Sequence, residues 1–185
     1  ADEEEWKPLL QRIVETLENI WTYNREHRGE REFAIDGQLS NWVWHDETLW
    51  YIDTSTPLYR VNGVEQLDPE LFLKSAPSFL RWIIRLAFLD DVMNRYYEPR
   101  LVYIDLVANV FKEQQPHWVP VFARWIQDLV PDLDPPVTTE EVEKYYKEDK
   151  LIWALFLAFR RLDRWLTTRL FRRRYEFILP GKIVR

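Results

Sequence analysis

The chain has 185 residues, of which 46% are hydrophobic and 16% are aromatic, and its net charge is −6. This composition excludes a disordered chain, and the length is enough for one domain with a sizeable core. The absence of Cys excludes disulfides, thiolate metal sites and a Cys nucleophile. Only four Gly are present, where average usage gives about thirteen. We therefore expect long helices, no many-stranded barrel and no Gly-rich phosphate loop.

The sequence also bears on the cellular compartment. The N-terminal ADEEEW is acidic, unlike a signal or transit peptide. The longest uninterrupted apolar run, 151–159, has nine residues, which is too short to span a bilayer. We expect a cytoplasmic protein without a transmembrane segment.

The first part of the chain predicts one amphipathic helix over residues 5–28, ended by Gly29. Its apolar residues recur at steps of three and four, which places them on one helix face. These residues are Trp6, Leu9, Leu10, Ile13, Val14, Leu17, Ile20 and Trp21.

Short runs rich in aromatic and β-branched residues then predict strands over 33–35, 42–44, 49–52, 58–61 and 64–66. The four-residue connection 45–48 suggests that the second and third strands form a hairpin. A second hairpin should turn at Asn62-Gly63, because this dipeptide is the strongest short hairpin signal.

The rest of the chain is helical in pattern. The expected helices cover residues 78–97, 100–115, 117–130 and a last region from the capping-box pair Thr138 and Glu141 to about Arg173, with room for a break at Glu148-Asp149. The first of these is apolar nearly all round and should be buried. Pro116 suits a helix start, and the Pro-rich segment near 130–138 is a linker.

Three side chains that carry oxygen follow the first strands. Asp36 comes just after the strand 33–35, Asn41 follows five residues later, and Asp53 ends the hairpin. Because strand ends converge on one edge, we expect these residues in one small site. Carboxylate and amide oxygens suit Mg²⁺, and Asp36 could orient a hydroxyl and accept its proton. The alternative is structural: Asp36 and Asn41 cap turns, and Asp53 belongs to a polar strand exit.

This order resembles the C-terminal lobe of the protein-kinase-like fold, including its aminoglycoside and choline phosphotransferase relatives. In that family a long helix, a short strand, a catalytic Asp, an Asn five residues on, a hairpin and a metal-binding Asp follow one another. The resemblance implies that Asp36 is the catalytic residue and that Asn41 and Asp53 bind Mg²⁺ and, through it, ATP. It is clear over about fifty residues, and the later helices match by class only.

The chain also departs from the family pattern. Ala34 and Ile35 stand where many members have His and Arg, and Thr54 and Ser55 follow the metal Asp. The family needs an N-terminal lobe over the phosphates, but only thirty-five residues precede Asp36, and they predict a helix. The lobe therefore lies on the same longer protein or on another chain, or the chemistry is lost.

The sequence thus predicts one mainly α-helical domain with small β-hairpins over 1–185, arranged as the helical C-lobe of a kinase-like fold. Residues 1–68 hold the long helix and the catalytic-loop-like strands, and residues 69–185 form a helical subdomain. The implied function is transfer of the ATP γ-phosphoryl to a hydroxyl acceptor once an N-lobe is supplied. The alternative is a catalytically inactive, pseudokinase-like helical module that binds a protein partner.

The charge is uneven along the chain. Residues 151–185 carry nine Lys/Arg against two Asp/Glu, so the remainder carries −13. One interpretation is an anionic partner, either nucleic acid or an acidic membrane surface. The other, which we favour here, is that these arginines pair with the acidic remainder of the chain. The acidic overall balance argues against nucleic acid.

Overall fold

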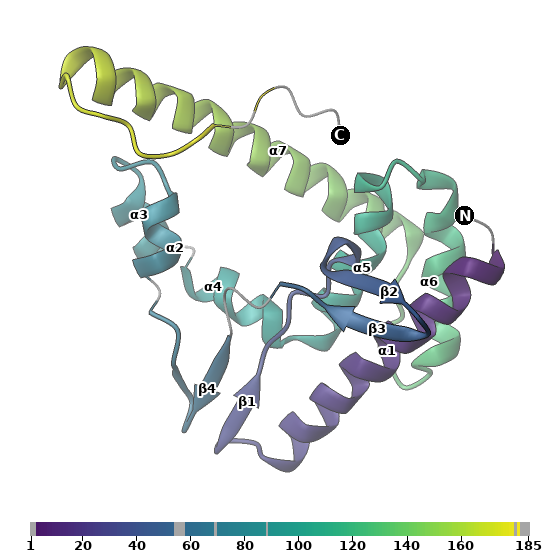
Figure 1. Ribbon diagram of the computed structural model, residues 1–185. Coiled ribbons are helices and arrows are strands. Elements are labelled where there is room, and N and C mark those ends of the chain that lie inside the picture. The colour runs from purple at the N-terminus through teal and green to yellow at the C-terminus, as the bar shows by residue number, and fades with distance from the viewer. Residues whose placement is uncertain (1–2, 54–57, 69, 88, 180, 182–185) are drawn as a thin grey trace. The chain divides into compact units, whose positions relative to one another are not determined.

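We analysed a computed structural model of the chain, which describes residues 3–53, 58–68, 70–87, 89–179 and 181. The described chain is mainly helical with two small antiparallel sheets (Figure 1), as the sequence predicts. Thr54 and Ser55, which depart from the family pattern, lie outside the described residues. No helix in the described part of the chain is long and apolar enough to cross a membrane.

The elements are α1 (Glu3–Glu26), β1 (Arg31–Phe33), η1 (Leu39–Asn41), β2 (Trp42–His45), β3 (Thr48–Tyr51), β4 (Tyr59–Val61), β5 (Val64–Glu65), α2 (Glu70–Ser75), α3 (Arg81–Ala87), α4 (Leu89–Asn94), η2 (Arg95–Tyr97), α5 (Pro99–Lys112), η3 (Pro116–Trp118), α6 (Val119–Leu129), α7 (Thr139–Trp165) and η4 (Leu166–Leu170). The chain divides into two compact units. The first contains Ala1–Leu67 and Met93–Tyr146, and the second contains Asp68–Val92 and Lys147–Arg185.

The core of the first unit lies between α1, α5 and α6. The predicted face of α1 supplies five buried residues, namely Leu10, Ile13, Val14, Leu17 and Trp21. All nine residues from Val102 to Val110 in α5 are buried. A helix that is buried on every side must carry its few polar residues inside the protein, where each needs a partner. This requirement shapes the candidate site described below.

Both predicted hairpins are present in the first unit. Strands β2 and β3 pair from Trp42 with Tyr51 to His45 with Thr48. Strands β4 and β5 turn at Asn62 and Gly63, whose φ angles of 51° and 74° are those that this turn requires. Strand β1 pairs with β4 to complete a three-stranded sheet. Strand β1 covers Arg31–Phe33, whereas we expected a strand over 33–35. Ala34 and Ile35 therefore follow the strand and are not part of it.

The helical segments need three corrections. The segment 78–97 is not one buried helix, because its helix begins at Arg81, residues 95–97 form a 3-10 turn, and Trp82 and Leu86 are 62% and 79% exposed. Phe88 lies outside the described residues. The segment 117–130 begins as a 3-10 turn at Pro116. Helix α7 runs without a break through Glu148-Asp149 and ends at Trp165. A π-helical turn over Leu166–Leu170 follows, and residues 171–173, which we expected to be helical, are not.

Residues 130–138 are the Pro-rich segment that we expected to be a linker. Residues 130–138 contain no helix or strand, and the hydroxyl of Thr138 accepts a hydrogen bond from the Glu141 backbone N–H at 3.2 Å. Arg100, in α5, binds this linker and the start of α7. Its Nε donates to the Pro135 carbonyl at 2.8 Å, and its guanidinium pairs with the Glu141 carboxylate.

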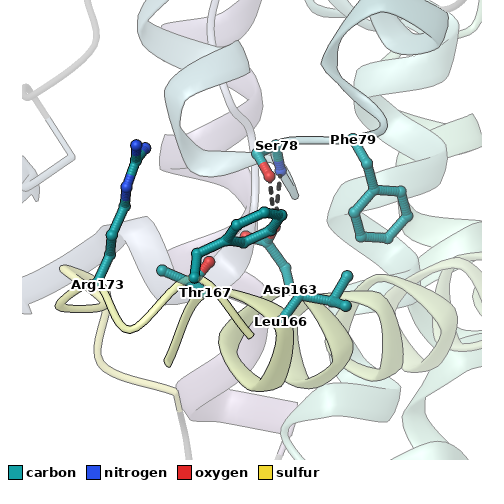
Figure 2. A pocket seen from close by; sticks show the side chains of 7 residues that line it. Ser78, Phe79, Asp163, Leu166, Thr167 and Arg173 are labelled. Carbon is teal, nitrogen blue, oxygen red and sulfur yellow. Dashed lines mark hydrogen bonds between the residues drawn. The ribbon is translucent and has the colours of Figure 1, made fainter. Parts of the chain in front are cut away.

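The second unit is built on the C-terminal part of α7. Asp163 is 5% exposed, and its Oδ1 accepts hydrogen bonds from the hydroxyl and backbone N–H of Ser78, at 2.5 and 3.3 Å (Figure 2). Phe79 meets Phe159 edge to face, with ring centroids 6.1 Å apart. After η4 the chain folds back along α7, since the Tyr175 hydroxyl donates to the Arg160 carbonyl and the Phe177 ring lies 4.0 Å from the Arg160 guanidinium.

Candidate functional site

The loop that carries Asp36 is fixed at its entrance by α1. The side-chain amide of Asn24 donates to the Phe33 carbonyl at 2.7 Å and accepts from the Phe33 N–H at 2.8 Å. The next backbone N–H groups, of Ala34 and Ile35, donate to the carbonyls of Leu58 and Tyr96. The direction in which the chain leaves β1 is therefore set by three separate segments.

Both the side chain and the backbone carbonyl of Asp36 accept hydrogen bonds. Its carboxylate accepts the Gln38 N–H at 3.1 Å, which is an Asx turn. Its backbone carbonyl accepts one hydrogen bond from Asn41 Nδ2, at 3.2 Å, and one from the Tyr51 hydroxyl, at 3.3 Å. The Ile52 N–H donates to the Asn41 carbonyl at 2.9 Å, which brings the end of β3 back to the loop. The sequence-predicted residues Asp36 and Asn41 are thus in direct contact.

Asp53 follows one residue after Ile52 and is partly buried. Its negative charge acts on Asp36, where it helps to raise the pKa of that carboxyl. Burial of Asp36 is the largest cause of this upward shift, and the Gln38 N–H opposes it. The same burial, with the charges of Asp36 and Asp53, raises the pKa of the Tyr51 hydroxyl. The structure therefore brings the hairpin end and the Asp36 loop into one electrostatic environment.

Helix α5 forms the floor of the site. Asn109 is 1% exposed, and its side chain accepts the Ser40 N–H at 3.3 Å and donates to Gln38 Oε1 at 3.2 Å. Gly37 packs on the same helix so closely that an added Cβ would lie 2.6 Å from Val102 Cγ1. The Asp36 loop rests on α5 because a glycine allows the approach and a buried amide satisfies the loop's polar groups.

Two further charged residues of α5 belong to the site. Asp105 is 6% exposed and accepts a hydrogen bond from the Tyr145 hydroxyl at 3.0 Å. Lys112 Nζ lies 4.0 Å from Asp105 Oδ1. The charge of Asp105 raises the pKa of Asp36, and that of Lys112 lowers it. The charges of Asp53, Asp105 and Lys112 thus act on the Asp36 carboxyl, and Asn41, Asn109 and Tyr51 bind the loop that carries it.

Sequence reasoning missed Asp105, Asn109 and Lys112. The sequence does contain a pattern that indicates them. These residues follow one another at steps of four and three in a mainly apolar helix, and such spacing places them on one helix face. A polar face on an otherwise apolar helix indicates a polar partner inside the fold.

The oxygen atoms of this site can be assessed as ligands of a metal ion. Within the described ranges, no three His, Cys, Asp or Glu residues are grouped so that they could hold one. Mg²⁺ needs less from a protein, since it commonly uses one or two carboxylates together with water and substrate phosphates. Asn41 donates through its nitrogen to Asp36, so its amide oxygen remains as the atom of that side chain that suits a cation. Asn41 and Asp53 fit this limited role.

Comparison with known proteins gives a family but no activity. The family model DUF6206, described as a family of unknown function, matches residues 1–164. The chain belongs to the DUF6206 family. The match covers the Asp36 loop and all of α7 except its last residue, Trp165. No curated protein and no solved structure matches this DUF6206 chain.

Proposed function

We propose that this chain is the C-terminal lobe of a kinase-like phosphotransferase, which transfers the ATP γ-phosphoryl to a hydroxyl acceptor once a second lobe covers the nucleotide. One observation carries the proposal. Asn41 and Tyr51 both donate to the Asp36 backbone carbonyl, the Gln38 N–H donates to the Asp36 carboxylate, and the charge of Asp53 acts on that carboxylate. The order of these residues along the chain is the one for which the family resemblance implies a catalytic Asp36 and metal-binding Asn41 and Asp53.

In this proposal Asp36 is the catalytic base. The acceptor hydroxyl donates a hydrogen bond to the Asp36 carboxylate, which orients its oxygen toward the γ-phosphorus. As the new O–P bond forms, the bond from the γ-phosphorus to the bridging oxygen breaks, ADP leaves, and Asp36 takes the hydroxyl proton. The raised pKa of Asp36 supports this role, because a base works best when its pKa is close to the working pH.

Asn41 and Asp53 would hold Mg²⁺, which supplies positive charge to the phosphate oxygens when bound. Lys112 provides a second positive charge to the same environment from α5. The lobe that covers the nucleotide would come from the same longer protein or from another chain. The mass of the intact protein from its own cell, compared with the mass of this chain, distinguishes these two sources.

The test is Mg²⁺-dependent ATP binding to the intact protein, measured by calorimetry, followed by a phosphoryl-transfer assay. Asp53→Asn should abolish the Mg²⁺ dependence of binding. Asp36→Asn should leave ATP binding within about threefold, and it should lower transfer by at least about a hundredfold. Asp132→Asn, an exposed linker carboxylate, is the control. If wild type binds no Mg²⁺–ATP when all its partners are present, the proposal fails.

A second candidate is the catalytically inactive, pseudokinase-like module that binds a protein partner. The observation in its favour is the apolar surface of α3, where Trp82 and Leu86 are 62% and 79% exposed at one-turn spacing. This candidate predicts that Trp82→Ser with Leu86→Ser removes a co-purifying protein from the natural source. It also predicts that Asp53→Asn has no effect on nucleotide binding.

A further inference from the structure

Helix α7 exposes a continuous apolar stripe in the second unit. The stripe consists of Leu151, Ile152, Leu155, Phe159, Leu162 and Trp165, which are between 38% and 65% exposed. At 3.6 residues per turn these six positions fall within an arc of about 140°. The other side of the same helix is covered, since Arg160 and Asp163 are buried against the return segment and Ser78.

A cluster of arginines lies at the end of this stripe. Its members, which we call the basic cluster, are Arg161, Arg164, Arg169, Arg172, Arg173 and Arg174, and all six are exposed. Within the described residues of the second unit, no side chain of the basic cluster forms an ion pair. For these six arginines, the pairing that we expected with acidic residues of the chain is therefore not seen inside this unit. Figure 2 shows that Arg173 lines a pocket together with Ser78 and Asp163.

The basic cluster is interleaved with further apolar side chains. Leu170 and Phe171 are each 63% exposed and Ile178 is 96% exposed. Arg172 has a φ of 52°, which turns the chain back along α7 and places its last exposed residues beside the helix that carries the stripe. The unit as a whole contains fourteen Lys/Arg against eight Asp/Glu, in a chain whose net charge is −6.

We propose that the α7 stripe and the basic cluster form a surface that binds an anionic lipid membrane, with the helix lying in the interface. Trp, Leu and Phe on one face of a helix and arginines at its border are the two elements that interfacial binding requires, namely apolar insertion and attraction to acidic headgroups. Either element alone binds weakly, and the two together give stable attachment. This inference does not depend on the proposed phosphotransferase activity.

The chemistry of the surface distinguishes a membrane from the other anionic or apolar partners. A nucleic acid would satisfy the arginines, but it offers no hydrocarbon for the aliphatic side chains of Leu151, Leu155 and Leu162. A second copy of the chain would cover the stripe, but it would bring another basic cluster to the interface, and like charges repel. An acidic bilayer surface complements both features at once.

The first experiment is sedimentation of the full chain with phosphatidylcholine vesicles, with and without phosphatidylserine. We expect binding only to the phosphatidylserine vesicles, with affinity that falls as salt rises. Each arginine near an anionic surface contributes about fivefold to affinity, so R172Q, R173Q and R174Q together should weaken binding by about a hundredfold. The matched control replaces three exposed arginines of the first unit, as R28Q, R31Q and R124Q, and should retain wild-type binding.

The second experiment uses the absence of Cys in the chain to place a single label. An environment-sensitive dye on Ile152→Cys should shift to the blue with phosphatidylserine vesicles, because the stripe enters the interface. The same dye on Val64→Cys, at a site in β5 that is 62% exposed, should not shift. Circular dichroism of each variant confirms that it is folded.

Several outcomes would overturn the proposal. Absence of binding to phosphatidylserine vesicles would do so, as would equal loss of binding in the two triple-arginine variants. A dye shift at residue 152 that depends on protein concentration and needs no vesicles would identify a second copy as the occupant. Displacement of the chain from vesicles by a tighter-binding RNA would identify a nucleic-acid surface.

Discussion

The side-chain nitrogen of Asn41 donates a hydrogen bond to the backbone carbonyl of Asp36, five residues earlier, at 3.2 Å. This contact makes the two predicted site residues one structural unit. It also gives Asn41 a structural function that is independent of any metal. The chemistry of the site and the stability of its loop can therefore be tested separately.

Replacement of Asn41 should destabilise the protein in a graded way. Asn41→Ala removes one hydrogen bond and should cost about 1 kcal/mol of unfolding free energy. Asn41→Asp should cost more, about 1–3 kcal/mol, because it removes the donor and turns a carboxylate toward the Asp36 carbonyl. Urea unfolding measures both, with Ser40→Ala, an exposed neighbour, as the control. Equal stability of the Asn and Asp proteins would contradict this assignment.

Gly37 should not tolerate a side chain. The Cβ of Gly37→Ala would lie 2.6 Å from Val102 Cγ1, so α5 or the loop must shift, at a cost of about 1–3 kcal/mol. A second substitution, Val102→Ala, removes the atom that clashes, so the double variant should lose less stability than the two single losses added together. Gly181→Ala, where no atom lies within 4 Å, is the control. Additive losses would exclude the steric cause.

The raised pKa of Asp36 predicts a pH dependence of stability. An acid whose folded-state pKa is raised binds more protons when folded, so its contribution to stability decreases as pH rises above the unfolded value of 3.8. Asp36→Asn keeps the oxygen that accepts the Gln38 N–H and removes the charge. Its midpoint of thermal unfolding should exceed that of wild type at neutral pH, and the difference should shrink below pH 3.8. A variant less stable than wild type at neutral pH would refute the prediction.

Arg100→Lys should be a costly exchange despite the retained charge. Arg100 donates to Glu141 through two nitrogens and to the Pro135 carbonyl through a third, and a lysine cannot reproduce this planar arrangement. We expect a loss of about 1–2 kcal/mol in denaturant unfolding. Arg124→Lys, at an exposed position on α6, should change stability by less than about 0.5 kcal/mol. If Arg100→Lys and Arg124→Lys lose similar amounts of unfolding free energy, the planar arrangement of the Arg100 hydrogen bonds contributes little to stability.

Ser78→Ala should weaken the second unit. It removes the hydroxyl that donates to the buried Asp163 carboxylate and leaves the longer bond from the Ser78 N–H. Hydrogen bonds to charged groups contribute about 1.5–3 kcal/mol. Hydrogen exchange of the α7 amides near Asp163 should therefore accelerate. Thr167 lines the same pocket as Ser78 and Asp163 (Figure 2), and Thr167→Ala, as the comparison, should leave these rates nearly unchanged.

The features that local patterns determine were predictable from the sequence. The apolar steps in α1 and the Asn62-Gly63 turn depend on neighbours within a few residues, so their structure follows from periods of 3.6 and 2 and from one turn dipeptide. The burial of segment 78–97 was predicted wrongly, because burial depends on more than the local pattern. Apolar composition shows that a helix can be buried, but it does not show what covers it, and Trp82 and Leu86 are exposed.

The candidate site was predictable only in part. The order of Asp36, Asn41 and Asp53 along a strand, loop and hairpin indicated that they would lie together. Asp105, Asn109 and Lys112 were not found, because Ser40 and Asn109 are separated by 69 residues and no local period connects them. Polar residues in an apolar helix indicate that a buried partner exists, but only the tertiary structure identifies it.

The dependence of the Asp36 loop on α5 has a consequence for biosynthesis. The contacts of Gln38 and Ser40 with Asn109 span 71 and 69 residues, so the loop cannot reach its final form until the ribosome has released α5. At about 5–20 residues per second, this delay lasts several seconds. During that time the hairpin and α1 can form, while the loop between them lacks its support. The candidate site is therefore completed late, and a truncated chain that ends before α5 would contain Asp36, Asn41 and Asp53 but not the α5 residues that complete the site.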